Sequence, residues 1–171
     1  MRVFKPRVYY KSIFDVNYNL LKKKNIKAVI FDLDNTIMKV DEEIPSKEVI
    51  DLFEKLNKDF KVFIASNNEE ERVKNIGKVL NVHAFYKVSK PTKKIKKLLL
   101  HKYEVNMREV AIIGDQIVTD IFMGNRLHMY TVLIDPMANK DLRITYFNRW
   151  LERRILKIIR LKRGEYYEEV L

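Results

Sequence analysis

The chain of 171 residues contains no cysteine. This absence excludes a disulfide framework and every metal site with thiolate ligands, and it fits a reducing compartment. Glycine and proline occur only four times each, so low-complexity tracts and long flexible linkers are absent as well. We therefore expect a single domain that spans residues 1–171.

Long apolar runs are also missing from the sequence. Charged residues interrupt the stretch Met-Arg-Val-Phe-Lys-Pro-Arg at the start, which therefore lacks the apolar segment of a secretory signal. No uninterrupted apolar run approaches the ~18 residues that are needed to cross a bilayer. We expect a cytoplasmic protein that does not span a membrane and that can contact the inner face of a membrane peripherally.

Acidic residues are outnumbered, since 34 Lys and Arg stand against 23 Asp and Glu and give a net charge of +11. Such an excess favours anionic partners, namely phosphates, nucleic acid or acidic lipid headgroups. A basic surface that is simply solvated explains the charge equally well. Because no recognition motif for nucleic acid is evident, nucleic acid is not the favoured partner.

The middle of the chain alternates between strand-like and helix-like segments. Short apolar runs predict strands at 27–32, 60–65, 82–88, 110–114 and 129–134, and helical spacing predicts helices at 46–58, 68–80 (capped by Asn68), 92–102 and up to about 127. This alternation predicts an α/β fold of the Rossmann-like, doubly wound kind, with a mostly parallel sheet flanked by helices. In such sheets the functional groups gather at the carboxyl ends of the strands.

Polar motifs follow four successive predicted strands, at the expected edge of the sheet. They are Asp32-Leu33-Asp34-Asn35-Thr36, Ser66-Asn67-Asn68, Ser89-Lys90-Pro91-Thr92, and Gly114-Asp115-Gln116 with Asp120. Each motif alone has an ordinary explanation, such as a solvated turn or a helix cap. Their occurrence in order at four strand ends is what points to a functional site.

These residue types predict a phosphoryl-transfer site. Asp32 and Asp34 can face one cavity, where two such carboxylates repel each other unless a cation joins them. With Asp115 added, the all-oxygen ligand set suits Mg²⁺ rather than Zn²⁺. The charge of Lys90 and the hydroxyl of Ser66 then provide the positioning and charge stabilisation on which phosphoryl transfer depends.

With these four motifs, residues 26–135 resemble the core of the haloacid dehalogenase superfamily of phosphatases. The resemblance implies that Asp32 attacks phosphorus and forms an aspartyl-phosphate, while Asp34 first protonates the leaving oxygen and later accepts a proton from water. It also implies that Mg²⁺ binds the carboxylate of Asp32, the backbone carbonyl of Asp34 and Asp115, with Asp120 supporting the metal shell.

The remaining motif residues are implied to bind the substrate. Ser66 and Lys90 would hold the phosphate oxygens. Asn35 and Asn67 would orient the phosphate or the substrate, although hydrogen bonding within their own loops explains them equally well.

The spacing of the motifs leaves no room for a cap domain. Only 31 residues separate Asp34 from Ser66 and only 23 separate Ser66 from Lys90, whereas a folded cap needs on the order of 50 residues. The site is therefore expected to be open, so that a neighbouring subunit covers it or the substrate is large or bound to a surface. Residues 37–44 could still form a small flap.

Three segments, residues 25–32, 90–92 and 114–127, narrow the resemblance to the capless class IIIA, YqeG-type branch. That branch is similar to the mitochondrial phosphatidylglycerophosphate phosphatases, which implies dephosphorylation of phosphatidylglycerophosphate, an anionic phospholipid. The alternatives are a phosphatase for a soluble sugar phosphate or a nucleic-acid end, and a non-catalytic module that binds anionic membranes.

Residues 143–163 predict a basic amphipathic helix. Apolar residues recur at helical spacing from Ile144 to Ile158, and the segment holds eight Lys or Arg with one acidic residue, Glu152. Such a helix, here with Trp150, suits the interface of an anionic membrane. It equally suits a helix that packs its apolar face on the core, and both can hold at once. The N-terminal residues Arg2, Lys5, Arg7, Tyr9, Tyr10 and Lys11 are expected to add to the same surface.

Overall fold

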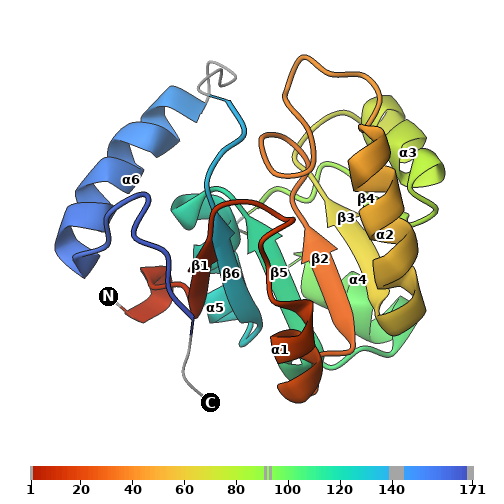
Figure 1. Ribbon diagram of the computed structural model, residues 1–171, viewed down its shortest axis with the longest axis horizontal. Helices are drawn as coiled ribbons and strands as arrows, with labels where there is room; N and C mark the ends of the chain where they lie inside the picture. Colours follow the sequence, from red (N-terminus) through yellow and green to blue (C-terminus); the bar gives the residue numbers. More distant parts are fainter. Residues whose placement is uncertain (1, 91, 93, 139–144, 169–171) are drawn as a thin grey trace.

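The centre of the computed structural model, which describes residues 2–90, 92, 94–138 and 145–168, is a six-stranded sheet in the order β1-β6-β5-β2-β3-β4 (Figure 1). The strands are β1 (Val8–Tyr10), β2 (Ala28–Phe31), β3 (Lys61–Ala65), β4 (His83–Phe85), β5 (Val110–Gly114) and β6 (Tyr130–Ile134). Every neighbouring pair is parallel. The predicted Rossmann-like α/β fold is confirmed.

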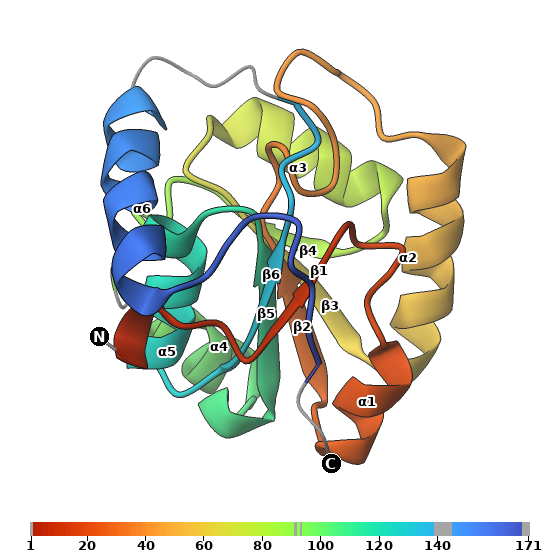
Figure 2. The same cartoon turned by 60° about the vertical axis from the view of Figure 1, so that its left-hand side comes forward.

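Helices cover both faces of the sheet (Figure 2). One face carries α1 (Tyr18–Lys23), α2 (Lys47–Asp59) and α3 (Glu70–Val79), and the other carries α4 (Lys94–Tyr103), α5 (Phe122–Arg126) and α6 (Thr145–Ile159). Short 3₁₀ helices lie at η1 (Arg2–Phe4) and η2 (Met107–Glu109), and a π-helix, η3 (Ile117–Ile121), follows β5. Successive residues of β2 pack into opposite cores, which is why buried parallel strands are continuous apolar runs.

The connections between the motifs contain only elements of the core. The chain between Asp34 and Ser66 holds a loop, α2 and β3, and the chain between Ser66 and Lys90 holds α3 and β4. Neither connection inserts a cap domain, as the spacing predicted.

The first strand, β1, was not predicted from the sequence. It is only three residues long, and it forms because it pairs with β6, more than 120 residues away in the chain. Tyr9 and Tyr10 are buried in it, so the expectation that they add to a basic surface was wrong. The charged residues of this stretch, Arg2, Lys5, Arg7 and Lys11, are exposed.

The C-terminal helix α6 docks on the core. Ile155 of α6 and Leu161 beyond it are buried against Tyr9 and η3. The helix ends at Ile159, earlier than predicted, because Arg160 takes a left-handed conformation (φ 55°). The predicted start at residues 143 and 144 lies outside the described residues.

The segment after α6 returns along the sheet and pairs antiparallel with the outer edge of β1 through Tyr167 and Tyr9. It therefore covers an edge strand that would otherwise expose unpaired backbone groups. Within the part of the chain that the structure describes, no helix has the length and apolar character that crossing a membrane requires.

Docking of α6 predicts different effects for two isoleucines on the same helix. Ile155 is 6% exposed, whereas Ile158 is 58% exposed. We expect Ile155→Ala to lower the free energy of unfolding by about 2–5 kcal/mol, because it removes buried methyl groups and leaves a cavity. The matched control Ile158→Ala should change it by less than about 0.5 kcal/mol. Equal effects of the two variants in urea unfolding would contradict this docking.

Candidate active site

The four motifs meet at the carboxyl edge of the sheet. Asp32 directly follows β2, and its N–H donates to the carbonyl of Ile113 at 2.9 Å, which extends the strand ladder and fixes the Asp32 backbone. Asp115 directly follows β5, the neighbour of β2. The residues predicted from strand ends are thus brought together by the pairing of adjacent parallel strands.

Three aspartates form a buried carboxylate cluster, which consists of Asp32, Asp115 and Asp120. One carboxylate oxygen from each of them lies within 4.8 Å of the corresponding oxygens of the other two. Asp120, which was expected only to support the metal shell, lies in the cluster itself. The carboxylate of Asp34 lies outside it, so a contribution of Asp34 to the metal site would come from its backbone, as the resemblance implied.

The ammonium group of Lys90 binds two members of the carboxylate cluster. It donates to Asp32 and, at 2.8 Å, to Asp120. Burial alone would lower the pKa of Lys90, but the carboxylates of Asp120 and Asp32 outweigh burial and raise the pKa above its usual value. Lys90 therefore stays charged.

The carboxylate cluster fits a divalent metal ion. Burial, followed by the negative charge of Asp120, raises the pKa of Asp32 well above its usual value, although Lys90 opposes this shift. When all three carboxylates are ionised, they and the one ammonium group carry two negative charges in total. A divalent cation with a preference for oxygen ligands would neutralise these charges and keep Asp32 ionised.

Gly114 makes room for Asp120. A Cβ at position 114 would lie 2.5 Å from the Asp120 carboxylate, so any other residue would displace that side chain. The second Asp120 oxygen accepts hydrogen bonds from the Gln116 N–H and the Thr119 hydroxyl, both at 3.3 Å. The turn of η3 thus holds Asp120 over the end of β5.

Asp34 has two partners on the segment that follows β3. Its carboxylate accepts a hydrogen bond from the Asn68 amide at 3.2 Å and pairs with the Arg72 guanidinium at 3.1 Å. Asn68 was predicted to cap α3, but the cap position is Glu69, and the Asn68 side chain points to Asp34 instead. Arg72 was not predicted as a site residue, because nothing in its position on α3 indicates which carboxylate it reaches.

Arg72 also anchors the loop that was expected to form a flap, residues 37–44. Its guanidinium donates to the carbonyl of Glu42 at 2.7 Å and to that of Lys39 at 3.4 Å. The loop begins with two buried residues, Ile37 and Met38, and ends at Ile44, which is 70% exposed. One arginine thus fixes both the loop and the Asp34 side chain.

The other predicted substrate-binding residues support the loops of the site. Both polar atoms of the Asn67 amide bind the backbone of Lys90, at 2.7 and 3.3 Å. Asn35 has a left-handed backbone (φ 60°), and its N–H donates to the carbonyl of Met38 at 2.8 Å. Ser66 is buried, and its hydroxyl oxygen accepts a hydrogen bond from the Asn68 N–H at 3.0 Å, which leaves its O–H to act as a donor.

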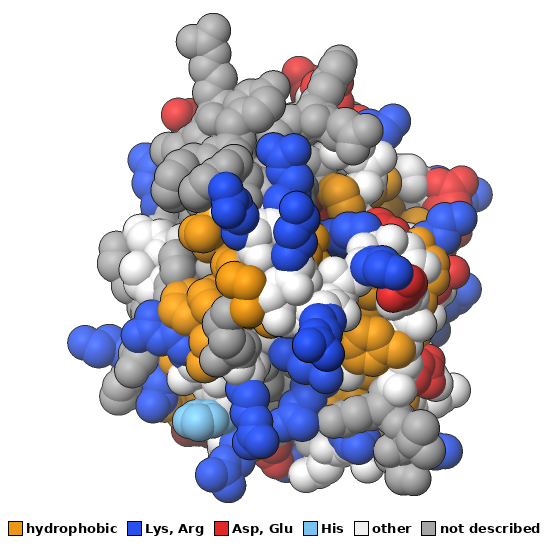
Figure 3. All heavy atoms as spheres, turned by 90° about the vertical axis from the view of Figure 1, so that its left-hand side faces the viewer, with side chains coloured by type: hydrophobic (Ala, Val, Ile, Leu, Met, Phe, Trp, Pro, Cys, Tyr) orange, Lys and Arg blue, Asp and Glu red, His pale blue; other side chains and the backbone are white. Residues whose placement is uncertain are grey.

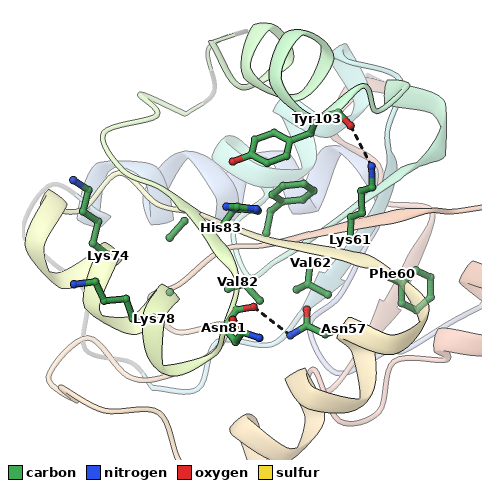
Figure 4. A pocket seen from close by; sticks show the side chains of 13 residues that line it. Asn57, Phe60, Lys61, Val62, Lys74, Lys78, Asn81, Val82, His83 and Tyr103 are labelled. Carbon is green, nitrogen blue, oxygen red and sulfur yellow. Dashed lines mark hydrogen bonds between the residues drawn. The ribbon is translucent and has the colours of Figure 1, made fainter.

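A cavity of about 610 Å³ lies elsewhere, along β4 at the amino ends of the strands (Figure 4). Lys61, Lys74, Lys78, His83 and Tyr103 are among the residues that line it. None of the motif residues that the structure describes contributes to it, because they occupy the opposite, carboxyl ends of the strands. The cavity is therefore separate from the carboxylate cluster.

Comparison with known proteins identifies a family and its relatives. The model of the family described as mitochondrial PGP phosphatase matches residues 1–137. The Bacillus subtilis (strain 168) protein named "Probable phosphatase YqeG" is 37% identical, over 98% of each chain. Phosphatidylglycerophosphate phosphatase 1, chloroplastic/mitochondrial, of Arabidopsis thaliana is 24% identical over 86% of this chain, which spans only 48% of that protein.

Solved structures share the fold at low sequence identity. A HAD phosphatase from Thermococcus onnurineus is 14% identical and has a TM-score of 0.56, over 69% of this chain and 90% of that one. A HAD family enzyme from Bacteroides thetaiotaomicron, in complex with magnesium and inorganic phosphate, is 14% identical and has a TM-score of 0.52. The match covers 71% of this chain and 99% of that one. The chain therefore belongs to the family described as mitochondrial PGP phosphatase and is a phosphatase that shares the fold of the solved HAD phosphatases.

Proposed function

We propose that this phosphatase converts phosphatidylglycerophosphate to phosphatidylglycerol through a magnesium-dependent aspartyl-phosphate mechanism with Asp32 as the nucleophile. The observation that carries the catalytic part is the meeting of Asp32, Asp115, Asp120 and Lys90 in one buried site. The substrate is supported by the family match and by the name of the Arabidopsis relative.

In the first step, a carboxylate oxygen of Asp32 attacks phosphorus, and the bond from phosphorus to the leaving glycerol oxygen breaks. Asp34 gives a proton to that oxygen, which departs as the alcohol. Asp34 suits this role because its side chain is more exposed to solvent than that of Asp32, at 18% against 9%.

In the second step, water attacks phosphorus while Asp34 takes up one of its protons. The bond between phosphorus and the Asp32 oxygen breaks, so that inorganic phosphate leaves and the free carboxylate returns. Lys90 and the Ser66 hydroxyl bind the phosphate oxygens during both steps. Mg²⁺, held by Asp32 and Asp115 with the Asp34 carbonyl and with Asp120 beside them, would neutralise charge on the transferred phosphoryl group.

The open site suits a substrate that stays at a surface. The connections between the motifs insert no cap domain, so a lipid headgroup can reach the site while the acyl chains remain in the bilayer. The basic residues Arg153, Lys157 and Arg160 are exposed on or next to α6, and Figure 3 shows Lys and Arg side chains gathered on the face that carries this helix. This face is proposed to contact an anionic membrane, where each cation contributes about 1 kcal/mol.

The nucleophile is tested with Asp32→Asn. We expect metal-dependent phosphate release to fall by about 10⁴-fold or more, because the amide cannot form the covalent intermediate. The variant should still fold, because Lys90 keeps its ion pair with Asp120. Asp59→Asn, on the exposed end of α2, is the control and should keep full activity. Wild-type turnover by the Asp32→Asn variant would refute the mechanism.

The substrate is tested by comparing phosphatidylglycerophosphate in mixed micelles with sugar phosphates and phosphorylated oligonucleotides. We expect the lipid to have the highest kcat/KM. Changing Arg153, Lys157 and Arg160 together to Gln should weaken binding to anionic vesicles by about 100-fold, which is the combined effect of three cations. The same change at Lys22, Lys23 and Lys24 on or next to α1 is the matched control. A preference for a soluble phosphate would exclude the lipid assignment, and equal binding to neutral and anionic vesicles would exclude the membrane contact.

The contact between Arg72 and Asp34 is tested through the leaving group. If Arg72 positions Asp34 as the general acid, removing Arg72 should slow the reaction most when the leaving oxygen is strongly basic, because such an oxygen needs a proton in order to leave. We expect Arg72→Met to lower kcat for phenyl phosphate by about 10–100-fold, and for 4-nitrophenyl phosphate much less. Lys74→Met on the same helix is the control. An equal loss with both substrates would mean that Arg72 only stabilises the fold.

A further inference from the structure

The guanidinium group of Arg163 spans the carboxyl ends of two strands next to the site. It donates to the carbonyl of Ile134 at the end of β6, at 2.8 Å, and to the carbonyl of Asp115 just after β5, at 2.7 Å. Asp115 belongs to the carboxylate cluster. A residue 48 positions further along the chain thus holds the peptide group of a proposed metal ligand.

A buried carboxylate fixes the position of Arg163. Glu152 of α6 is only 3% exposed, and it accepts a hydrogen bond from the same guanidinium. Burial alone would lower the pKa of Arg163, but the Glu152 carboxylate outweighs burial and raises it, so the arginine stays charged. Because desolvation offsets much of the attraction in an ion pair that is largely shielded from water, such a pair is weak as a source of stability. Its geometry, which aims the two donor groups at two carbonyls, offers a better reason for its presence.

Further contacts restrain the segment that carries Arg163. The Tyr166 hydroxyl donates to Asp135 at 2.6 Å, and the Gly164 N–H donates to the Tyr9 hydroxyl at 2.9 Å. Tyr9 in turn donates to Asp135, which directly follows β6. These contacts bind residues 163–166 to β1 and to the end of β6. The position of the guanidinium is therefore restrained both by Glu152 of α6 and by the backbone of its own segment.

We propose that Arg163, held by Glu152, is a positioning residue for the metal site and acts through the Asp115 peptide. The Asp115 peptide follows the last paired residue of β5, where the strand ladder no longer fixes it. The hydrogen bond from Arg163 to the Asp115 carbonyl restricts rotation of the peptide group between Asp115 and Gln116. This restriction directs the Asp115 side chain toward the carboxylate cluster. The inference rests on the proposed function in one respect, because it takes Asp115 as a metal ligand.

Glu152 and Arg163 both lie beyond residues 1–137, the part of the chain that the family model matches. The motifs of the core therefore give no sign of them. The C-terminal segment gains a second role beside docking on the core, because it completes the support of the metal site.

The test measures Mg²⁺ binding directly, by isothermal titration calorimetry on the full chain without substrate. We expect Arg163→Met to raise the dissociation constant for Mg²⁺ by about 10–100-fold, as loss of a residue that orients a metal ligand typically does. Arg163→Lys should give a smaller increase, because one ammonium group lacks the fork that reaches two carbonyls. The neighbour Lys162, which is 79% exposed and pairs with Glu165, provides the control Lys162→Met, with unchanged affinity.

Melting curves separate positioning from stability. A variant Arg163→Met that melts lower but binds Mg²⁺ as tightly as the wild type would overturn the proposal. If that variant does not fold, Glu152→Gln and Arg163→Lys decide, and unchanged affinity in both would overturn it equally. Asp115→Asn should bind Mg²⁺ far more weakly, and wild-type affinity there would remove the basis of the inference. A failure of phosphate release alone, with Mg²⁺ binding still dependent on Arg163, would count against the proposed function only.

Discussion

The ammonium group of Lys90 lies between the carboxylates of Asp32 and Asp120, shielded from solvent, and the site depends on this contact. Charges in such surroundings need partners of opposite sign, since water no longer solvates them. Among these four described groups, one ammonium group does not balance the three carboxylates of Asp32, Asp115 and Asp120. The remaining two negative charges explain why the site fits a divalent metal ion.

The parallel sheet makes this concentration of charge possible. Its strands carry their polar ends to one edge, while α1–α3 and α4–α6 bury the two faces in apolar cores. The apolar cores therefore supply the stability that the crowded carboxylates reduce. Such a division of roles is common, because a site suited to catalysis is rarely arranged for greatest stability.

Two arginines hold the edges of the site through backbone carbonyls. Arg72 of α3 fixes the loop after β2 together with the Asp34 carboxylate, and Arg163 fixes the turn after β5 together with Glu152. The planar guanidinium suits this use, since its several donors point in fixed directions and reach two or three acceptors at once. The C-terminal segment thereby joins three features, an apolar contact with the core, an exposed basic face and support for the Asp115 peptide.

The sequence by itself determined the strands β2, β3, β5 and β6, because a strand buried on both faces is a continuous apolar run. It also indicated that Asp32, Lys90 and Asp115 would meet, because parallel strands end at one edge. Only the tertiary structure decided that β1 is a strand, that Asp120 joins the carboxylate cluster, and which groups Arg72 and Arg163 hold. The physical reason is distance along the chain: local spacing sets the face on which a side chain lies, whereas its partner depends on how remote segments pack.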